Sequence, residues 1–428
     1  MNQPKALKNI RSKVARHKSA RQASILLLST LTGVFLGMIV SVINTRALPP
    51  TEYGDVRYVN NYVSFFSGIL LLGYFVSGSR LLAVARSPRQ SSEIKGATLV
   101  ILGITALGVI LLTFFCGLVH QFILHKSFAY LFYVVLPVSL NSILLNYINT
   151  TSQGDNSIGM IAGARLFPAF FYICISWPIY SFYGASPAKM LWLHNGISII
   201  VLSILLILNR PSFHNLQHSL RLLNEENRQY GIHVYLGSLA NLSIPYIAGV
   251  TLGLFAPNNS NVAFYTLALT ISMPLSFVPS VIGTTYFKKF ASQNTISPSV
   301  IKTTVLVTLI SLCGYCIVIF PLVRFLYDSS YQTVAIFGCW LAIASSAQGL
   351  GDVFNRFLGA HAQGKSLRNG AWVSGAISLI GYIAGVYYWE INGAIATRIC
   401  ASVAYMLCMI YYYRKFIHNP IFYDNSNA

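Results

Sequence analysis

Runs of about 20 apolar residues recur along the whole chain, and no other feature limits its fold as strongly. A helix rises 1.5 Å per residue, so a run of about 20 residues crosses the roughly 30 Å hydrocarbon core of a membrane. Each run therefore predicts a transmembrane helix. The sequence indicates an all-α, polytopic membrane protein with twelve transmembrane helices, at approximately 23–45, 58–84, 97–119, 128–149, 158–182, 189–208, 233–256, 261–286, 302–323, 332–351, 370–388 and 394–413.

The scarcity of charge supports a membrane location. Only 9% of the 428 residues are charged, whereas a soluble domain carries about a quarter, so lipid must cover most of this surface. The net charge of +19 does not indicate nucleic-acid binding, because the basic residues occur in short segments between apolar runs. A nucleic-acid-binding protein needs a continuous basic face. Nucleic acid is therefore not expected as a partner.

The placement of lysine and arginine predicts the orientation of the chain. With the N-terminus in the cytoplasm, most of the 29 basic residues fall on cytoplasmic segments, as the positive-inside rule requires. Both termini are then cytoplasmic. The basic residues that do not fall on cytoplasmic segments are Arg46, Arg57, Lys126, Lys189 and Arg324 on the outer side, and Arg165 and Arg398 within spans.

A long polar segment divides the chain into two halves of six spans. At a constant offset, Pro50 matches Pro257 and Tyr58 matches Tyr265, which favours a parallel duplication. The predicted parts are a basic cytoplasmic segment at 1–22, an N-terminal half at 23–208, a cytoplasmic linker at 209–232, a C-terminal half at 233–413 and a cytoplasmic tail at 414–428.

Five arginines have no charged counterpart in the matching half, so the shared architecture does not require them. Arg165 stands out because it lies roughly 12 Å inside its span. A charge near mid-bilayer costs about 2.5–3.5 kcal/mol, so it should face a wet cavity or an anion. A structural arginine that bonds neighbouring carbonyls is the alternative. The candidate substrate-binding residues are Arg165, Arg46, Arg57, Arg398 and Arg80.

Five other residues are candidates for gating or ion coupling. Glu52 and Asp55 lie between Arg46 and Arg57, in an outer turn between the first two spans. That turn either serves as a gate or is held together by mutual salt bridges. His194 can exchange a proton near neutral pH, although a structural histidine is the alternative. Asp352 and Arg356 are one helical turn apart and can neutralise each other.

The sequence lacks the motifs of most enzymes. No Walker loop, GxSxG, HExxH or paired Cys/His metal spacing is found, so neither a cofactor nor a metal is expected. A membrane glycosyltransferase would need an outer loop large enough to carry its chemistry. Most loops here are short, so that alternative ranks last and the protein is not expected to be an enzyme.

Two stretches resemble a known transporter family. "TRALPPTEYGDV" is similar to the signature after the first helix of the polysaccharide transporter family, through Arg46, Leu48, Pro50, Tyr53 and Gly54. Near the end, "QGK", a small-residue helix, an "NGAIAT" turn and "YYYRK" resemble the last two helices of the same family. The likeness is to the O-antigen flippases (Wzx-type) of the multidrug/oligosaccharidyl-lipid/polysaccharide (MOP) exporter superfamily. Arg398 departs from the pattern, which usually has an apolar residue there.

This resemblance implies a function. Such a protein translocates an undecaprenyl-pyrophosphate-linked oligosaccharide across the bacterial inner membrane by alternating access coupled to an ion. Its partners would be the lipid-linked oligosaccharide and membrane lipids, with O-antigen polymerase and a chain-length regulator as further candidates. Arginine forks suit the phosphate oxygens of this substrate. The alternative is a small-molecule antiporter of the related multidrug (MATE) type.

Overall fold

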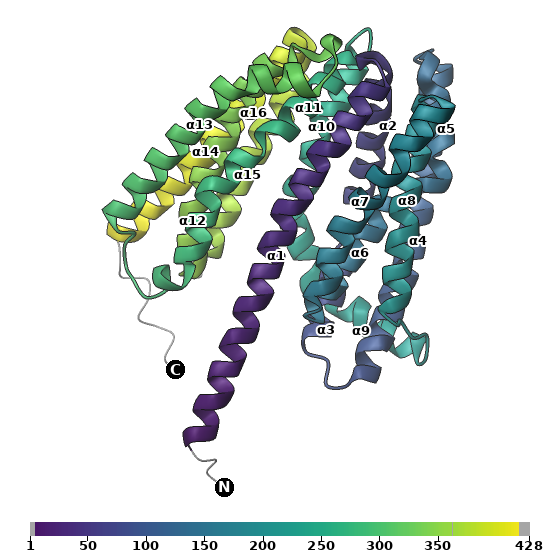
Figure 1. The fold of residues 1–428 in the computed structure, drawn as a ribbon. Coiled ribbons are helices and arrows are strands. Elements are labelled where there is room, and N and C mark those ends of the chain that lie inside the picture. The colour runs from purple at the N-terminus through teal and green to yellow at the C-terminus, as the bar shows by residue number, and fades with distance from the viewer. Residues whose placement is uncertain (1–4, 362, 419–428) are drawn as a thin grey trace. The chain divides into compact units, whose positions relative to one another are not determined.

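The computed structural model describes residues 5–361 and 363–418, without the side chains of 5–24, 27, 237, 238, 240–245 and 288. The described backbone is built from helices and contains no strand (Figure 1). This confirms the prediction of an all-α, polytopic membrane protein. The predicted basic segment 1–22 and tail 414–428 extend beyond the described residues, and their cytoplasmic location stays a prediction.

The number of spans is compatible with twelve. Within the described residues, nine helices are long and apolar enough to cross a membrane, or ten if one bent pair forms a single span. The helical stretch Gly364–His418 counts once in that total but covers two predicted spans. The predicted span 233–256 contributes only the short apolar helix Tyr246–Phe255, because part of it lies outside the described side chains.

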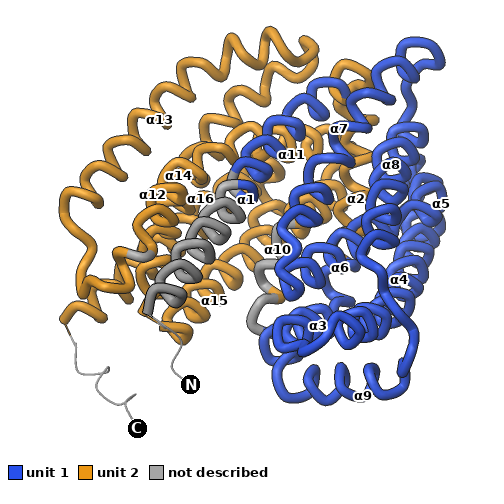
Figure 2. Tube along the Cα trace, turned by 60° about the horizontal axis from the view of Figure 1, so that its bottom comes forward, with its two compact units in different colours: residues 1–43, 66–236 blue, residues 44–65, 237–428 orange. Residues whose placement is uncertain are grey.

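The first compact unit comprises residues 1–43 and 66–236 (Figure 2, blue). In this unit α6 occupies the centre, because it contacts α3, α4, α7 and α8. The helix α9 lies within the predicted linker and packs against α3 and α4. The helices of this unit are α1 (Lys5–Ala47, which continues past the unit boundary), α3 (Tyr74–Ala83), α4 (Pro88–Phe122), α5 (Tyr130–Val135), α6 (Asn141–Gly154), α7 (Ile158–Tyr183), α8 (Pro187–Leu208) and α9 (Leu216–Glu226).

The second compact unit comprises residues 44–65 and 237–428 (Figure 2, orange). Its central helix is α14, which contacts α11, α12, α13, α15 and α16. Two of its helices, α2 and α10, begin or end in the first unit. The helices are α2 (Pro50–Ile69), α10 (Ile232–Phe255), α11 (Ser260–Ser272), α12 (Pro274–Phe290), α13 (Pro298–Leu326), α14 (Val334–Ala360), α15 (Gly364–Ile380) and α16 (Val386–His418).

The second predicted span, 58–84, is broken. Helices α2 and α3 meet at a bend of 59°. Leu72 and Gly73 have φ angles of 47° and 82° there, a left-handed conformation that frees backbone groups from the helix. The side chain of Asn227 compensates, because its Nδ2 donates to the Leu72 carbonyl and its Oδ1 accepts from Ser77 Oγ, both at 3.2 Å. A residue of the predicted linker therefore stabilises the broken span.

The connection between α1 and α2 is much shorter than the outer turn predicted from the sequence. Helix α1 continues to Ala47 and α2 begins at Pro50, so only Leu48 and Pro49 connect them. The first helical turns of α2 accordingly carry Glu52, Asp55 and Arg57, which were expected in a loop between two helices. Proline is well suited to the first residue of a helix, because its fixed φ is already helical and its missing N–H would have no partner there. The predicted outer turn included Pro50, which was wrong, whereas Pro49 does lie in the connection.

The predicted "NGAIAT" turn is also wrong. Residues 392–397 are helical and lie within α16. The chain instead bends at Glu390, whose φ of 47° and ψ of −128° are not helical. A π-helical turn at Gly381–Gly385 precedes this bend. Gly385 and Gly393 approach so closely that a Cβ on Gly393 would lie 1.9 Å from the Gly385 carbonyl oxygen. Small residues therefore permit the close packing on either side of the bend.

Candidate functional site

Arg165 contacts the first transmembrane helix within the first unit. It lies on α7 with its side chain exposed, and its Nη1 donates to Thr30 Oγ1 at 2.6 Å. Thr30 in turn donates to the Leu26 carbonyl at 2.7 Å. The partner of Arg165 is thus a hydroxyl rather than the carbonyls of the structural alternative. A guanidinium has five N–H donors, and Thr30 is the one hydrogen-bond partner of Arg165 among the described residues, so most of these donors are available to a ligand there.

His194 lies in a polar and aromatic cluster between α7 and α8. Its ring packs edge-on against Tyr172, with the centroids 5.0 Å apart. Tyr172 and Tyr180 share a hydrogen bond of 2.8 Å, and Asn195 Oδ1 accepts from Asn141 Nδ2 at 2.9 Å. The environment of His194 therefore contains polar side chains from three helices. Its role in ion coupling stays a prediction.

Arg80 is bound to the segment that precedes α10. Its Nη1 forms a 2.7 Å ion pair with Glu226 Oε1, and its guanidinium lies 4.5 Å from the centre of the Tyr230 ring. Its side chain is 54% exposed, so such an exposed ion pair contributes little stability. These contacts join α3 to the predicted linker within the first unit.

Arg46 binds the end of a distant helix in the second unit. Its Nε donates to the Leu326 carbonyl and its Nη2 to the Phe325 carbonyl, each at 2.9 Å. Those carbonyls are at the C-terminus of α13, where the helix dipole favours a cation. Nearby, Asp55 Oδ1 accepts from Asn259 Nδ2 at 2.6 Å. Arg46 and Asp55, two of the four charged residues of the predicted outer turn, therefore have protein partners outside that turn.

The phenol of Tyr331 lies beside these charges. Its hydroxyl donates to the Leu48 carbonyl at 2.8 Å, which fixes the short connection between α1 and α2. Burial is the main reason that the pKa of Tyr331 is raised above its usual value, and the neighbouring Tyr53, Asp328 and Glu52 raise it further. Glu52 therefore lies within electrostatic range of a buried, neutral phenol.

Asp352 and Arg356 do not form the ion pair that their spacing predicts. Among the described residues, no ion pair joins them: Asp352 Oδ1 accepts from Tyr405 at 3.0 Å, and Arg356 Nη2 donates to Ser280 Oγ at 3.4 Å. Side chains from α12 and α16 are their nearer partners, while the charge of Arg356 still acts on Asp352, so their mutual neutralisation stays a prediction. Both residues do lie in one polar cluster inside the second unit.

Arg398 lies near two buried tyrosines. The hydroxyls of Tyr265 and Tyr382 are 3.2 Å apart, and both rings are buried. The charge of Arg398 lies within electrostatic range of Tyr265. Arg398 follows the bend at Glu390 by about two helical turns, on the helix that contacts α11 and the π-helical turn.

Three of the predicted arginines share an unusual feature. Within the part of the chain that the structure describes, the Nε–H groups of Arg57, Arg356 and Arg398 are buried and have no hydrogen-bond acceptor. A buried donor on a charged group without an acceptor is strongly destabilising. Such groups are retained where a ligand or water supplies the acceptor. All three belong to the second unit.

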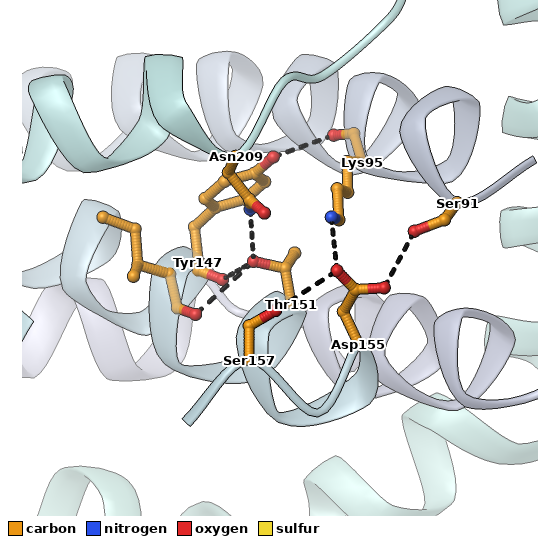
Figure 3. A network of polar contacts seen from close by, with 8 residues as sticks. Ser91, Lys95, Tyr147, Thr151, Asp155, Ser157 and Asn209 are labelled. Atoms are coloured by element: carbon orange, nitrogen blue, oxygen red, sulfur yellow. Dashed lines mark hydrogen bonds and ion pairs between the residues drawn. The ribbon is translucent and has the colours of Figure 1, made fainter. Parts of the chain in front are cut away.

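Sequence reasoning missed a second polar network, in the first unit (Figure 3). Lys95 Nζ forms an ion pair of 2.7 Å with Asp155 Oδ2, and Ser91 Oγ donates to Asp155 Oδ1 at 3.1 Å. The hydroxyl of Tyr147 donates to the Lys95 carbonyl at 3.0 Å. Asp155 is one of only ten acidic residues, which is the sequence signal that could have drawn attention to it.

The electrostatic balance at Asp155 favours its ionised form. Burial of the carboxyl raises its pKa, but the hydrogen bond and charge of Lys95, with the hydroxyls of Ser91 and Ser157, outweigh burial. The pKa of Asp155 is therefore below its usual value. Among the described residues, no three His, Cys, Asp or Glu side chains are grouped so that they could hold a metal ion.

Similarity to known proteins identifies the fold and the family. An inward-facing multidrug resistance MATE family transporter of the MOP superfamily matches with a TM-score of 0.68 and 14% identity, over 90% of this chain and 94% of that one. The lipid II flippase MurJ, in an inward closed conformation, matches with a TM-score of 0.70 and 13% identity, over 92% and 89%. A eukaryotic MATE transporter matches with a TM-score of 0.56 and 11% identity, over 94% and 98%.

These likenesses show the fold alone, because the identities are low. No curated protein matches the sequence. A family model described as "Polysaccharide biosynthesis protein" matches residues 19–287, which is more than half of the chain. The chain therefore belongs to the polysaccharide biosynthesis protein family and has the fold of MOP-superfamily transporters.

Proposed function

We propose that this protein is a flippase for a lipid-linked oligosaccharide. Its substrate would be an undecaprenyl-pyrophosphate-linked O-antigen repeat unit, moved from the cytoplasmic to the periplasmic leaflet of the bacterial inner membrane. The family match and a fold like that of a lipid II flippase support a transporter of this class. The termini would be cytoplasmic, and O-antigen polymerase and a chain-length regulator would act next to it.

The buried arginine donors without acceptors carry this proposal. Arg57, Arg356 and Arg398 each have an Nε–H that lacks an acceptor among the described residues, and Arg165 has most of its donors available. The diphosphate of the proposed substrate is rich in acceptor oxygens and suits the planar guanidinium. An exporter of cationic drugs would gain nothing from these groups, because like charges repel.

The proposed mechanism is alternating access. The headgroup would bind to arginines on one side and be released on the other, while the lipid tail stays in the membrane. Asp352 and His194 are the proposed ion-coupling groups, since both can change protonation state. Coupling would be electrostatic, because protonation of Asp352 changes the net charge that Arg356 and the substrate experience.

A deletion strain tests the proposal. We expect the strain to lose surface O-antigen and to accumulate lipid-linked repeat units on the cytoplasmic leaflet. Expression of the wild-type chain should reverse both defects. Unchanged surface polysaccharide together with increased sensitivity to cationic drugs would instead establish a MATE-type multidrug antiporter. The fold does not decide between these functions, because MATE transporters share it.

A further inference from the structure

A cavity of about 490 Å³ lies within the first unit, beside the Lys95–Asp155 pair. This volume is within the roughly 300–1,000 Å³ range of small-molecule pockets. Its walls come from the link between α3 and α4, the first turns of α4, the link between α6 and α7, and the end of α8. The positive-inside rule predicts that all these segments lie at the cytoplasmic end of the unit.

The inner wall of the cavity is neutral and internally satisfied. Lys95 is only 6% exposed, and its ammonium is held by Asp155. Both carboxylate oxygens of Asp155 are occupied, because Ser91 donates to Oδ1, while Lys95 and Ser157 donate to Oδ2 (Figure 3). Asp155, the one acid in the lining, is therefore neutralised by Lys95 and does not balance the charge of any other cation there.

Two further cations line the cavity without a partner. Among the described residues, neither the Arg86 nor the Arg210 guanidinium has a hydrogen-bond acceptor or an acid within ion-pair distance. Arg210 also has a φ of 49°, a left-handed backbone conformation that is unfavourable for a residue with a side chain. The lining consequently contains two arginines whose charges no acid of the lining balances.

The remaining lining favours an amphipathic, negatively charged ligand. Ser87 caps α4 by accepting from the Gln90 N–H, so the N-terminus of this long helix, with its partial positive charge, adjoins the cavity. Leu82, Met160 and Leu208 contribute apolar surface. Serine hydroxyls and arginine forks are the groups that bind phosphate oxygens.

We propose that this cavity binds a phosphate group with net negative charge, held between the Arg86 and Arg210 guanidinium groups. The ligand is either the headgroup of an anionic lipid of the cytoplasmic leaflet or a soluble phosphate compound. This site is distinct from the arginines of the proposed flippase function, and its existence does not depend on that function. Both arginines are exposed and form no ion pair among the described residues, so we expect their replacement to leave the fold intact.

Ligand-induced thermal stabilisation of the purified full-length protein tests the site, because a ligand that binds only the folded state raises its melting temperature. Sodium phosphate and pyrophosphate form the soluble arm. Dihexanoyl phosphatidylglycerol, compared with dihexanoyl phosphatidylcholine, forms the lipid arm. The variants are R86Q/R210Q and a control, R89Q/R221Q, which removes the same charge from exposed residues of the same unit outside the cavity lining.

We expect at least one of the added compounds to raise the melting temperature of the wild type and of the control. R86Q/R210Q should need at least a tenfold higher concentration of that compound for the same rise. Stabilisation by phosphatidylglycerol alone identifies a lipid headgroup, and stabilisation by pyrophosphate or phosphate alone identifies a soluble ligand. Stabilisation by both shows that phosphate chemistry suffices. Equal stabilisation of R86Q/R210Q and the wild type, or none of the wild type in either arm, overturns the proposal.

Discussion

The ammonium of Lys95 and the carboxylate of Asp155 are 2.7 Å apart, although 60 residues separate them in the sequence. The lysine is buried on α4, and the acid follows the last turn of α6. Removing one member of a buried ion pair leaves the other charge without compensation, which is more destabilising than loss of a surface pair. This pair therefore offers a direct test of how the first unit is held together.

Replacing Asp155 by Asn should destabilise the protein by roughly 1–3 kcal/mol, because Lys95 remains buried without its counter-charge. The effect is at the lower end for buried pairs, since the Asp155 side chain is 31% exposed. Thermal unfolding of the solubilised protein measures it. The matched control is Glu225→Gln, which removes the acid of the exposed Arg221 pair and should change stability by under about 1 kcal/mol. Equal melting temperatures for both variants would contradict the role of the pair.

The same pair predicts a dependence of stability on pH. The pKa of Asp155 is lowered in the folded state, so the ionised carboxylate stabilises the fold above its unfolded pKa of about 3.9. That stabilisation disappears as the pH falls through the depressed folded-state pKa. The difference in melting temperature between wild type and Asp155→Asn should thus be constant from about pH 5 to 7 and narrow below about pH 4. A difference that does not vary with pH would refute this assignment.

Arg46 should be important for the stability of the second unit. Replacing it with Ala removes two hydrogen bonds to the C-terminus of α13, at Phe325 and Leu326, with an expected loss of about 1–2 kcal/mol. Arg46→Lys keeps the charge but cannot donate from two fixed nitrogens, so its stability should lie between those of the wild type and Arg46→Ala. Melting temperatures of the two variants check this order. Arg324→Ala is the control, because this nearby arginine on α13 has no such contacts among the described residues.

Hydropathy predicted the helices well because a membrane helix must satisfy its backbone groups internally, so its length is visible in the sequence. Two predictions about where the chain turns were nevertheless wrong. Pro50 was expected within the turn between the first two spans, yet it begins α2. The family resemblance suggested a turn at 392–397, yet the chain stays helical there and bends at Glu390 instead.

Side-chain partners were far less predictable than helices. Asp352 and Arg356 have the spacing of a helical ion pair, but tertiary neighbours on other helices compete for both. The Lys95–Asp155 pair and the contact of Asn227 with the broken span join residues far apart in sequence, so only the folded chain reveals them. Arg165 could be singled out, because a charge deep in an apolar run is conspicuous without any structure.

Arg165 is the variant that most directly tests transport. Arg165→Ala should abolish surface O-antigen, while Arg165→Lys retains part, because lysine keeps the charge but binds phosphate at a single point. Thr30→Val removes the hydroxyl that holds the guanidinium and should reduce display by a smaller factor, of about two- to tenfold. Surface polysaccharide is measured by immunoblot, at equal amounts of membrane-inserted protein. Full display by the alanine variant would exclude the proposed role.

Arg398 should show a trade-off between stability and function. Its buried Nε–H has no acceptor among the described residues, so Arg398→Met removes an unsatisfied donor and a charge while keeping much of the side-chain volume. We expect this variant to be as stable as the wild type or about 1 kcal/mol more stable. Its O-antigen display should nevertheless fall at least tenfold, because a phosphate contact is lost.

The control for this variant is Arg324→Met, on the last turn of α13, which should leave display unchanged. O-antigen display is measured on intact cells, and the melting temperature is measured on protein from membranes of the same cultures. A less stable Arg398→Met would show that the arginine is a structural member of the Tyr265–Tyr382 cluster. A stable variant with full display would show that the substrate does not use it. Only preserved stability with lost display supports a ligand for this buried guanidinium, because a purely structural arginine cannot be removed at no loss of stability.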